Sequence, residues 1–192
     1  MLKGIAGLMR PARGTIECAP PGRGGIAYLP QHGETERRFP ISVIDTVLLG
    51  HWRRIGWAKA AIRERRQAAL AALGSVGLEG FERRPIGALS AGQFQRVLFA
   101  RLVVQDAGLI LLDELFGAVD WRTSEDLLGL IGRWRREGRT VVAVMHDLDQ
   151  VRAHFPDTVL IARECIPWGP TPEVLTAHHP VSGAPDVAAR YG

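Results

Sequence analysis

Short runs of hydrophobic residues that end in polar residues recur along the sequence. The run at 109–112 holds four apolar residues, too few for a helix, which predicts a strand buried on both faces, as in a parallel sheet. The β-branched run at 140–145 predicts a second buried strand, and Ile26–Leu29 a third, shorter one. Polar residues follow each run closely: Gln31, the pair Asp113 and Glu114, and His146. Ligands of open α/β sheets bind at the carboxyl ends of strands, so the pattern indicates a candidate site there.

Helical patterns occupy much of the chain between these runs. Two helices, at 42–49 and 58–73, follow each other without an intervening strand, which predicts a small helical lobe. Ser90 is a good N-cap for the next helix. The other expected elements are an amphipathic helix at 1–9, a strand at 14–16, a helix at 121–136, a hairpin at 159–162 and 165–168, and a helix capped by Thr171.

The two carboxylates that end the segment 109–114 suit a magnesium nucleotide. Asp113 is placed to help hold the metal, and Glu114 to polarise an attacking water. By themselves, these six residues fit a strand that runs into an acidic turn equally well. The small-residue loop 89–93 presents backbone N–H groups and the positive end of a helix dipole, which is typical of an anion site. An ordinary capped helix start explains that loop as well.

Composition narrows the class of protein. With 192 residues, 46% of them hydrophobic, the chain can bury one good core as a single domain. The pI of 9.7 invites a nucleic-acid partner, but the 24 basic residues are mostly arginines dispersed in pairs, without an aromatic-studded basic face. We therefore expect surface charge and no nucleic acid. No apolar run approaches the ~20 residues that span a bilayer, no signal peptide is recognisable, and two cysteines form no disulfide framework, which favours the cytoplasm.

Taken in order, the polar segments resemble those of the ATP-binding cassette ATPases, and the resemblance covers nearly the whole chain. The corresponding motifs are the Q-loop glutamine Gln31, the signature loop 89–93, the Walker B carboxylates Asp113 and Glu114, the D-loop residue Asp120, and the switch histidine His146. The resemblance implies an α/β fold of the P-loop NTPase type, with a parallel sheet flanked by helices. It implies a single domain over 1–192, incomplete at its N-terminus, with a helical signature subdomain inserted at about 40–105.

The same resemblance implies ATP and Mg²⁺ as cofactors and assigns a role to each site residue. Gln31 and Asp113 would serve the magnesium ion, Glu114 the attacking water, and His146 the γ-phosphate. In the family, two subunits sandwich ATP between them. Ser90 and the N–H groups of Ala91 and Gly92 would contact the γ-phosphate of the nucleotide held by the other subunit. Gln93 and Asp120 are further residues that the resemblance assigns to nucleotide binding, as is Gln31.

The segments 28–31, 39–45 and 48–51 look most like the ATPases of zinc and manganese importers, and 55–57 is similar to that subgroup too. Iron-siderophore and cobalamin importers share parts of the match, so they stay open as alternatives. The resemblance implies a homodimer that is peripheral on the inner face of the cell membrane. It would contact an integral membrane permease through the region around 32–57. The transported metal would not touch this chain, so its six histidines need not be ligands.

One family motif, the phosphate-binding loop Gly-x-x-x-x-Gly-Lys-[Ser/Thr], is absent from the 192 residues. Residues 1–8 look like the helix that follows that loop, so we expect the first strand and the P-loop to be missing from the N-terminus. The chain alone should then hydrolyse ATP little or not at all, and the strand at 141–145 should have an unpaired edge. The alternative is a non-hydrolysing cassette-like protein that binds a partner through its signature face.

Overall fold

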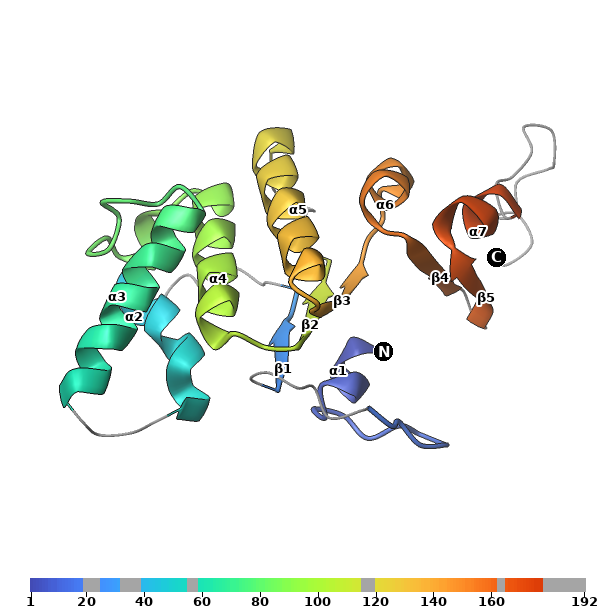
Figure 1. Cartoon of the computed structure of the whole chain (residues 1–192), viewed down its shortest axis with the longest axis horizontal. Helices are drawn as coiled ribbons and strands as arrows, with labels where there is room; N and C mark the ends of the chain where they lie inside the picture. Colours follow the sequence, from blue (N-terminus) through green and yellow to red (C-terminus); the bar gives the residue numbers. More distant parts are fainter. Residues whose placement is uncertain (19–24, 32–38, 55–58, 115–119, 162–164, 178–192) are drawn as a thin grey trace. The chain divides into compact units, whose positions relative to one another are not determined.

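The computed structural model describes residues 1–18, 25–31, 39–54, 59–114, 120–161 and 165–177 (Figure 1). The chain divides into two compact units, residues 1–145 and residues 146–192. Parts of several expected features lie outside the described residues: the turn at 117–119, the permease-contacting segments 32–38 and 55–57, and the tail after 177.

A three-stranded parallel sheet forms the centre of the first unit. Its strands are β1 (Ile26–Leu29), β2 (Leu109–Asp113) and β3 (Thr140–Val144), in the spatial order β1-β2-β3. The middle three residues of β2 are fully shielded from solvent, as expected for a strand covered on both faces. The three strands and their parallel pairing confirm the predictions made from the hydrophobic runs. Among the described residues β3 pairs only with β2, so the unpaired edge expected for β3 is present there.

Helices α2 (Val43–Leu48), α3 (Lys59–Ser75) and α4 (Ala91–Gln105) pack on one another beside the sheet, together with the 3-10 helix η2 (Leu49–Arg54) (Figure 1). A further 3-10 turn, η3 (Ile86–Ala88), leads into α4. Ser42 caps α2 by accepting a hydrogen bond from the Asp45 backbone N–H. Apolar residues of all three helices are buried, so the packing agrees with a helical lobe. Its limits at about 40 and 105 stay a prediction.

Helix α5 (Trp121–Arg136) has the bounds expected from the sequence, and it packs against β3 and α4. The ring of Trp134, on α5, stacks on that of Phe99, on α4, with centroids 5.8 Å apart and planes inclined by 7°. Both side chains are buried. This pair is a hydrophobic link between the two helices that carry the signature loop and Asp120 at their N-termini.

Gly50 lies where η2 meets α4. A Cβ atom at Gly50 would stand 2.5 Å from the carbonyl oxygen of Arg101, which is backbone and cannot rotate away. Gly50→Ala is therefore expected to destabilise the fold by about 1–3 kcal/mol, the usual range for overpacking, as measured by denaturant unfolding. Gly129→Ala is the matched control, because a Cβ at this position in α5 meets nothing within 4 Å. Ala favours the helix there by up to about 1 kcal/mol, and equal effects of the two substitutions would contradict the packing argument.

The second unit contains α6 (Leu148–His154), an antiparallel hairpin of β4 (Asp157–Ile161) and β5 (Cys165–Pro170), and α7 (Thr171–Ala177). The hairpin confirms the late pair of strands expected from the sequence. Thr171 is not the N-cap that we predicted. It is the first residue inside α7, and its hydroxyl bonds the carbonyl of Phe155 at 2.7 Å, because the chain entering the helix is already paired as β5.

Two expectations for the N-terminal segment are wrong, and glycine is the reason in each case. The helix expected at 1–9 is limited to α1 (Leu2–Ile5), because Gly7 adopts a left-handed φ of 73° and Leu8 N–H bonds back to the Lys3 carbonyl, which ends the helix. The strand expected at 14–16 does not form; Gly14, with a φ of 79°, is outside the extended region. No helix among the described residues is both long enough and apolar enough to cross a bilayer.

Candidate functional site

The carboxyl ends of β1 and β2 bring three of the predicted site residues together. Because Leu29 pairs with Leu112 in the parallel register, Gln31 and Glu114 come at equivalent positions beyond the two strands. Gln31 Nε2 donates a hydrogen bond to Glu114 Oε2 at 2.6 Å. Asp113, the last residue of β2, lies at the same end of the sheet. The sheet register thus places Gln31, Asp113 and Glu114 in one group, as predicted from the ends of the hydrophobic runs.

Tyr28 also belongs to this group, although it was not predicted as a site residue. Its hydroxyl donates to Asp113 Oδ2 at 2.8 Å. Partial burial, then this hydrogen bond and the charge of Asp113, raise the pKa of the Tyr28 phenol to about 12. The phenol therefore stays a proton donor throughout the physiological range. It fixes one oxygen of the carboxylate that was predicted to face a metal.

Glu114 has an unusual backbone conformation. Its φ of 48° lies in the left-handed region, which a residue with a Cβ adopts at a cost of roughly 1–2 kcal/mol. The left-handed residue directly after β2 is therefore the one whose carboxylate accepts the hydrogen bond from Gln31. Backbone strain of this kind concentrates at functional sites, where the surrounding structure imposes it.

The oxygen-rich end of the sheet fits a hard divalent cation such as Mg²⁺. Tyr28 bonds Asp113 Oδ2, and in the described part of the chain no hydrogen bond involves Oδ1. The Gln31 amide donates through Nε2, which leaves its carbonyl oxygen Oε1 as a second oxygen ligand. Carboxylate and amide oxygens, completed by water and phosphate, are the ligands that Mg²⁺ prefers.

Tyr28→Phe is expected to lower the free energy of unfolding by about 1 kcal/mol, because it removes one partly buried hydrogen bond to a charged acceptor. The difference should depend on pH. The folded-state pKa of Tyr28 is raised above the unfolded value near 10, so the stabilisation is complete below pH 10 and is lost as the pH rises toward about 12. Urea unfolding of both proteins at pH 8 and pH 11 measures this. A Tyr28→Phe difference that does not change with pH would contradict the assignment.

The signature loop forms the N-terminus of α4 through a complete capping box. Gln93 N–H bonds Ser90 Oγ at 3.2 Å, and Ser90 N–H bonds Gln93 Oε1 at 3.0 Å. Ser90 as N-cap confirms the prediction from the sequence. The N–H groups of Ala91 and Gly92 take no part in this box, so they are the donors at this helix end that remain for an anion.

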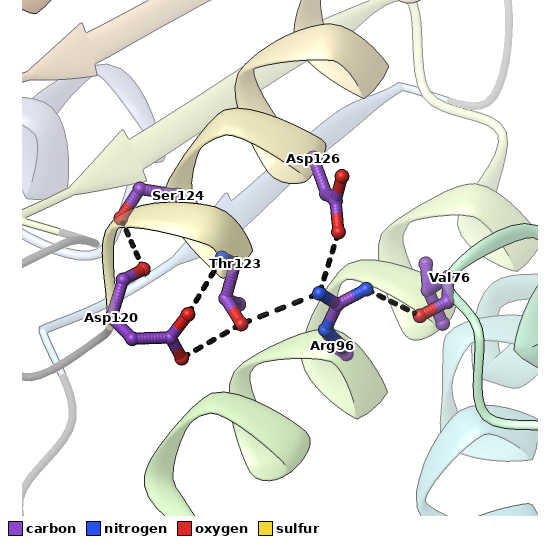
Figure 2. Close-up of polar contacts among 6 residues, drawn as sticks. All are labelled: Val76, Arg96, Asp120, Thr123, Ser124 and Asp126. Carbon is purple, nitrogen blue, oxygen red and sulfur yellow. Dashed lines mark hydrogen bonds and ion pairs between the residues drawn. The ribbon is translucent and has the colours of Figure 1, made fainter.

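Asp120 caps α5 and lies beside the start of α4 (Figure 2). Its carboxylate accepts from Thr123 N–H and from the Thr123 hydroxyl, both at 2.9 Å. These two bonds are the main reason that the pKa of Asp120 is below its usual value. A Cβ at Gly92 would stand 3.2 Å from Asp120 Oδ2. The structure therefore brings Asp120 and the signature loop together.

The predicted site residues thus fall into two groups within the first unit: Gln31, Asp113 and Glu114 at the strand ends, and residues 90–93 with Asp120 at the N-termini of α4 and α5. That the second group serves a nucleotide held by the other subunit stays a prediction. His146 follows β3 and is the first residue of the second unit. Its place beside Glu114 stays a prediction.

Residues 1–117 match the family model described as ABC transporter. The chain is 38% identical over 180 residues to the manganese transport system ATP-binding protein MntB of Listeria monocytogenes, covering 92% of this chain and 75% of that protein. It is 39% identical to a probable metal transport system ATP-binding protein of Chlamydia pneumoniae, covering 91% and 69%.

Solved structures of ABC transporter proteins have the same fold as this chain. An inward-facing conformation of a putative metal-chelate type ABC transporter superposes with a TM-score of 0.78 at 31% identity, covering 91% of this chain and 67% of that chain. CbiO1 from Clostridium perfringens, part of the ABC transporter complex cbiONQ, superposes with a TM-score of 0.71 at 23% identity, covering 91% and 73%.

Proposed function

Because this chain belongs to the ABC transporter family, we propose that it is the ATP-hydrolysing subunit of a membrane importer for a divalent metal, with manganese as the first candidate. The observation that carries the activity is the adjacency of Gln31, Asp113 and Glu114 at the ends of two paired parallel strands. The names of the relatives, which are manganese and metal transport proteins, support the substrate class.

In this proposal the strand ends hold the metal ion of the nucleotide. Asp113 and the amide oxygen of Gln31 are its protein ligands, and Tyr28 keeps the Asp113 carboxylate oriented. When bound, Mg²⁺ supplies positive charge that offsets the charge of the transferred phosphoryl group. Glu114 accepts a hydrogen bond from the attacking water and polarises it. The backbone at Glu114 is left-handed, and its carboxylate is held by the hydrogen bond from Gln31.

The second group of residues acts on the nucleotide of a partner copy. Ser90 and Gln93 shape the start of α4, and the N–H groups of Ala91 and Gly92, with the helix dipole behind them, receive the γ-phosphate. Asp120 borders the same nucleotide. His146, which follows β3, is assigned instead to the γ-phosphate of the nucleotide at this copy's own strand ends. Each nucleotide then needs both copies, so the proposal includes a homodimer.

The P-loop motif supplies the lysine and the amide cradle for the phosphates in this family, and the 192 residues do not contain it. The transport role requires an integral membrane permease. The region around 32–57 transmits nucleotide-driven closure to the permease at the cytoplasmic face of the membrane.

Uptake of radioactive metals by the cells that make this chain tests the proposal. Deleting the gene is expected to abolish high-affinity manganese uptake, and restoring the wild-type gene should recover it. Zinc, an iron siderophore and cobalamin are the parallel substrates, and loss of one of these with normal manganese uptake would reassign the cargo. Normal uptake of all four substrates would contradict the importer function and favour a non-hydrolysing partner-binding role.

A further inference from the structure

Arg96 joins three segments of the first unit (Figure 2). Its guanidinium donates to the Val76 carbonyl at 2.9 Å, to the Thr123 hydroxyl at 3.3 Å, and to Asp126 Oδ2 at 2.7 Å. These partners lie just after α3 and on α5, whereas Arg96 itself lies on α4. Because only 18% of the Arg96 side chain is exposed, these contacts are partly shielded from water.

The contacts continue from Arg96 to Asp120. The Thr123 hydroxyl accepts from Arg96 and donates to Asp120 Oδ2 at 2.9 Å. Gly92 packs against this same carboxylate, and it lies one helical turn before Arg96 on α4. A continuous series of neighbours thus links the starts of α4 and α5. It runs through the side chains of Arg96, Thr123 and Asp120 to the backbone at Gly92.

The three bonds of Arg96 differ in what they contribute. Asp126 is 55% exposed, and an ion pair in that setting adds little, about 0–1 kcal/mol. The Val76 carbonyl is fixed by the turn at Gly77, whose φ of 71° suits glycine, and a Cβ there would stand 3.6 Å from Arg96 Nη1. The bonds to Val76 and Thr123 therefore hold the guanidinium in place, and the Asp126 pair adds to them.

We propose that Arg96 is a positioning residue that, through Thr123, fixes the carboxylate of Asp120 beside Gly92 at the start of α4. The functional meaning of this inference rests on the proposed function, in which both features contact one nucleotide across the dimer. In this role Arg96 acts through its hydrogen bond to Thr123. It keeps the two contact points at a constant spacing, so that they engage together.

Nuclear magnetic resonance of the 192-residue chain without nucleotide tests this directly. The readouts are the pH titration of the Asp120 side-chain carboxyl and the backbone amide resonances of Ala91 and Gly92. Thr123→Val removes the hydroxyl and keeps the backbone N–H, and it should raise the pKa of Asp120 toward its usual value. Arg96→Met keeps the aliphatic stem, and it should shift the Asp120 titration in the same direction and move both amide resonances.

Non-additivity is the decisive result. In the Thr123→Val background, Arg96→Met should change the Asp120 titration less than it does in the wild type. Only the through-space attraction of the Arg96 charge is then left to lose, because the hydroxyl that links the two side chains is already gone. Asp126→Asn should leave the titration nearly unchanged. Arg63→Met is the matched control, because Arg63 is an exposed arginine of α3, remote in sequence from these contacts, and should affect neither readout.

The proposal is overturned if the two substitutions act additively, or if a folded Arg96→Met protein keeps the wild-type Asp120 titration and amide resonances. If Arg96→Met does not fold, Arg96→Lys and Thr123→Val give the same comparison. Because no nucleotide is present, this outcome is independent of the uptake experiment. The two experiments therefore fail separately. Normal metal uptake without this coupling contradicts this inference alone, and loss of the transport function with the coupling intact contradicts the proposed function alone.

Discussion

Replacing Glu114 by Gln is expected to lower ATP turnover by the transporter, assembled in its native membrane, by at least about 100-fold. Removing a group that polarises the attacking water typically costs 10²–10⁴ in rate. Gln has the same shape and keeps an oxygen toward Gln31, but it lacks the charge of the carboxylate. Binding of ATP should persist, since Asp113 and Gln31 remain to hold the metal ion.

Phosphate release from membranes that carry the Glu114→Gln subunit measures this effect, and retention of labelled ATP measures binding. Glu64→Gln, at an exposed position of α3, is the matched control and should turn over ATP at the wild-type rate. Loss of binding together with turnover would assign Glu114 to nucleotide binding rather than to activation of water. Turnover within a few-fold of the wild type would exclude Glu114 from the reaction.

Trp134→Ala is expected to lower the free energy of unfolding by about 3–5 kcal/mol, the usual range when a large buried aromatic side chain is truncated. Trp134 is 2% exposed, and its ring lies flat against Phe99 across the interface between α4 and α5. Truncation leaves a cavity between these helices and removes the stacking contact. A loss of this size is a large fraction of the 5–15 kcal/mol that stabilises a typical domain.

Trp121→Ala is the control, because Trp121 lies on the same helix and is 74% exposed. Its truncation should change the free energy of unfolding by no more than about 0.5 kcal/mol. Urea unfolding, followed by circular dichroism because both substitutions remove a tryptophan, compares the three proteins. Equal losses for the two substitutions would show that burial at Trp134 does not determine the effect.

Hydrophobic pattern was sufficient to predict the sheet and most helices. Continuous apolar runs predicted β2 and β3, and the helix expected at 121–136 has both of its ends at the predicted residues. The errors came where backbone conformation overrode the pattern. Gly7 and Gly14 adopt left-handed φ angles that end a helix and prevent a strand. Pattern alone cannot show these angles, because glycine is compatible with several conformations.

The candidate site was predicted from residues that follow strands, and the structure groups Gln31 with Asp113 and Glu114 as expected. Tyr28 was missed because its partner, Asp113, is 85 positions away in the sequence. Only the register of β1 against β2 brings the two side chains together. Arg96 was missed because it was one of many scattered arginines. Its contacts to Val76 and Thr123 depend on tertiary packing and cannot be read from the local sequence.

Asp120 is the N-cap of its own helix as well as a predicted contact of the nucleotide. An Asp120→Ala phenotype would therefore confound two defects, a frayed α5 and a lost ligand contact. Asn and Ser are good N-caps that carry no charge, so they separate these functions. If Asp120→Asn keeps transport and Asp120→Ala abolishes it, the essential role of Asp120 is to cap α5. A genetic screen that reports Asp120 as essential would then have identified a helix cap and not a nucleotide contact.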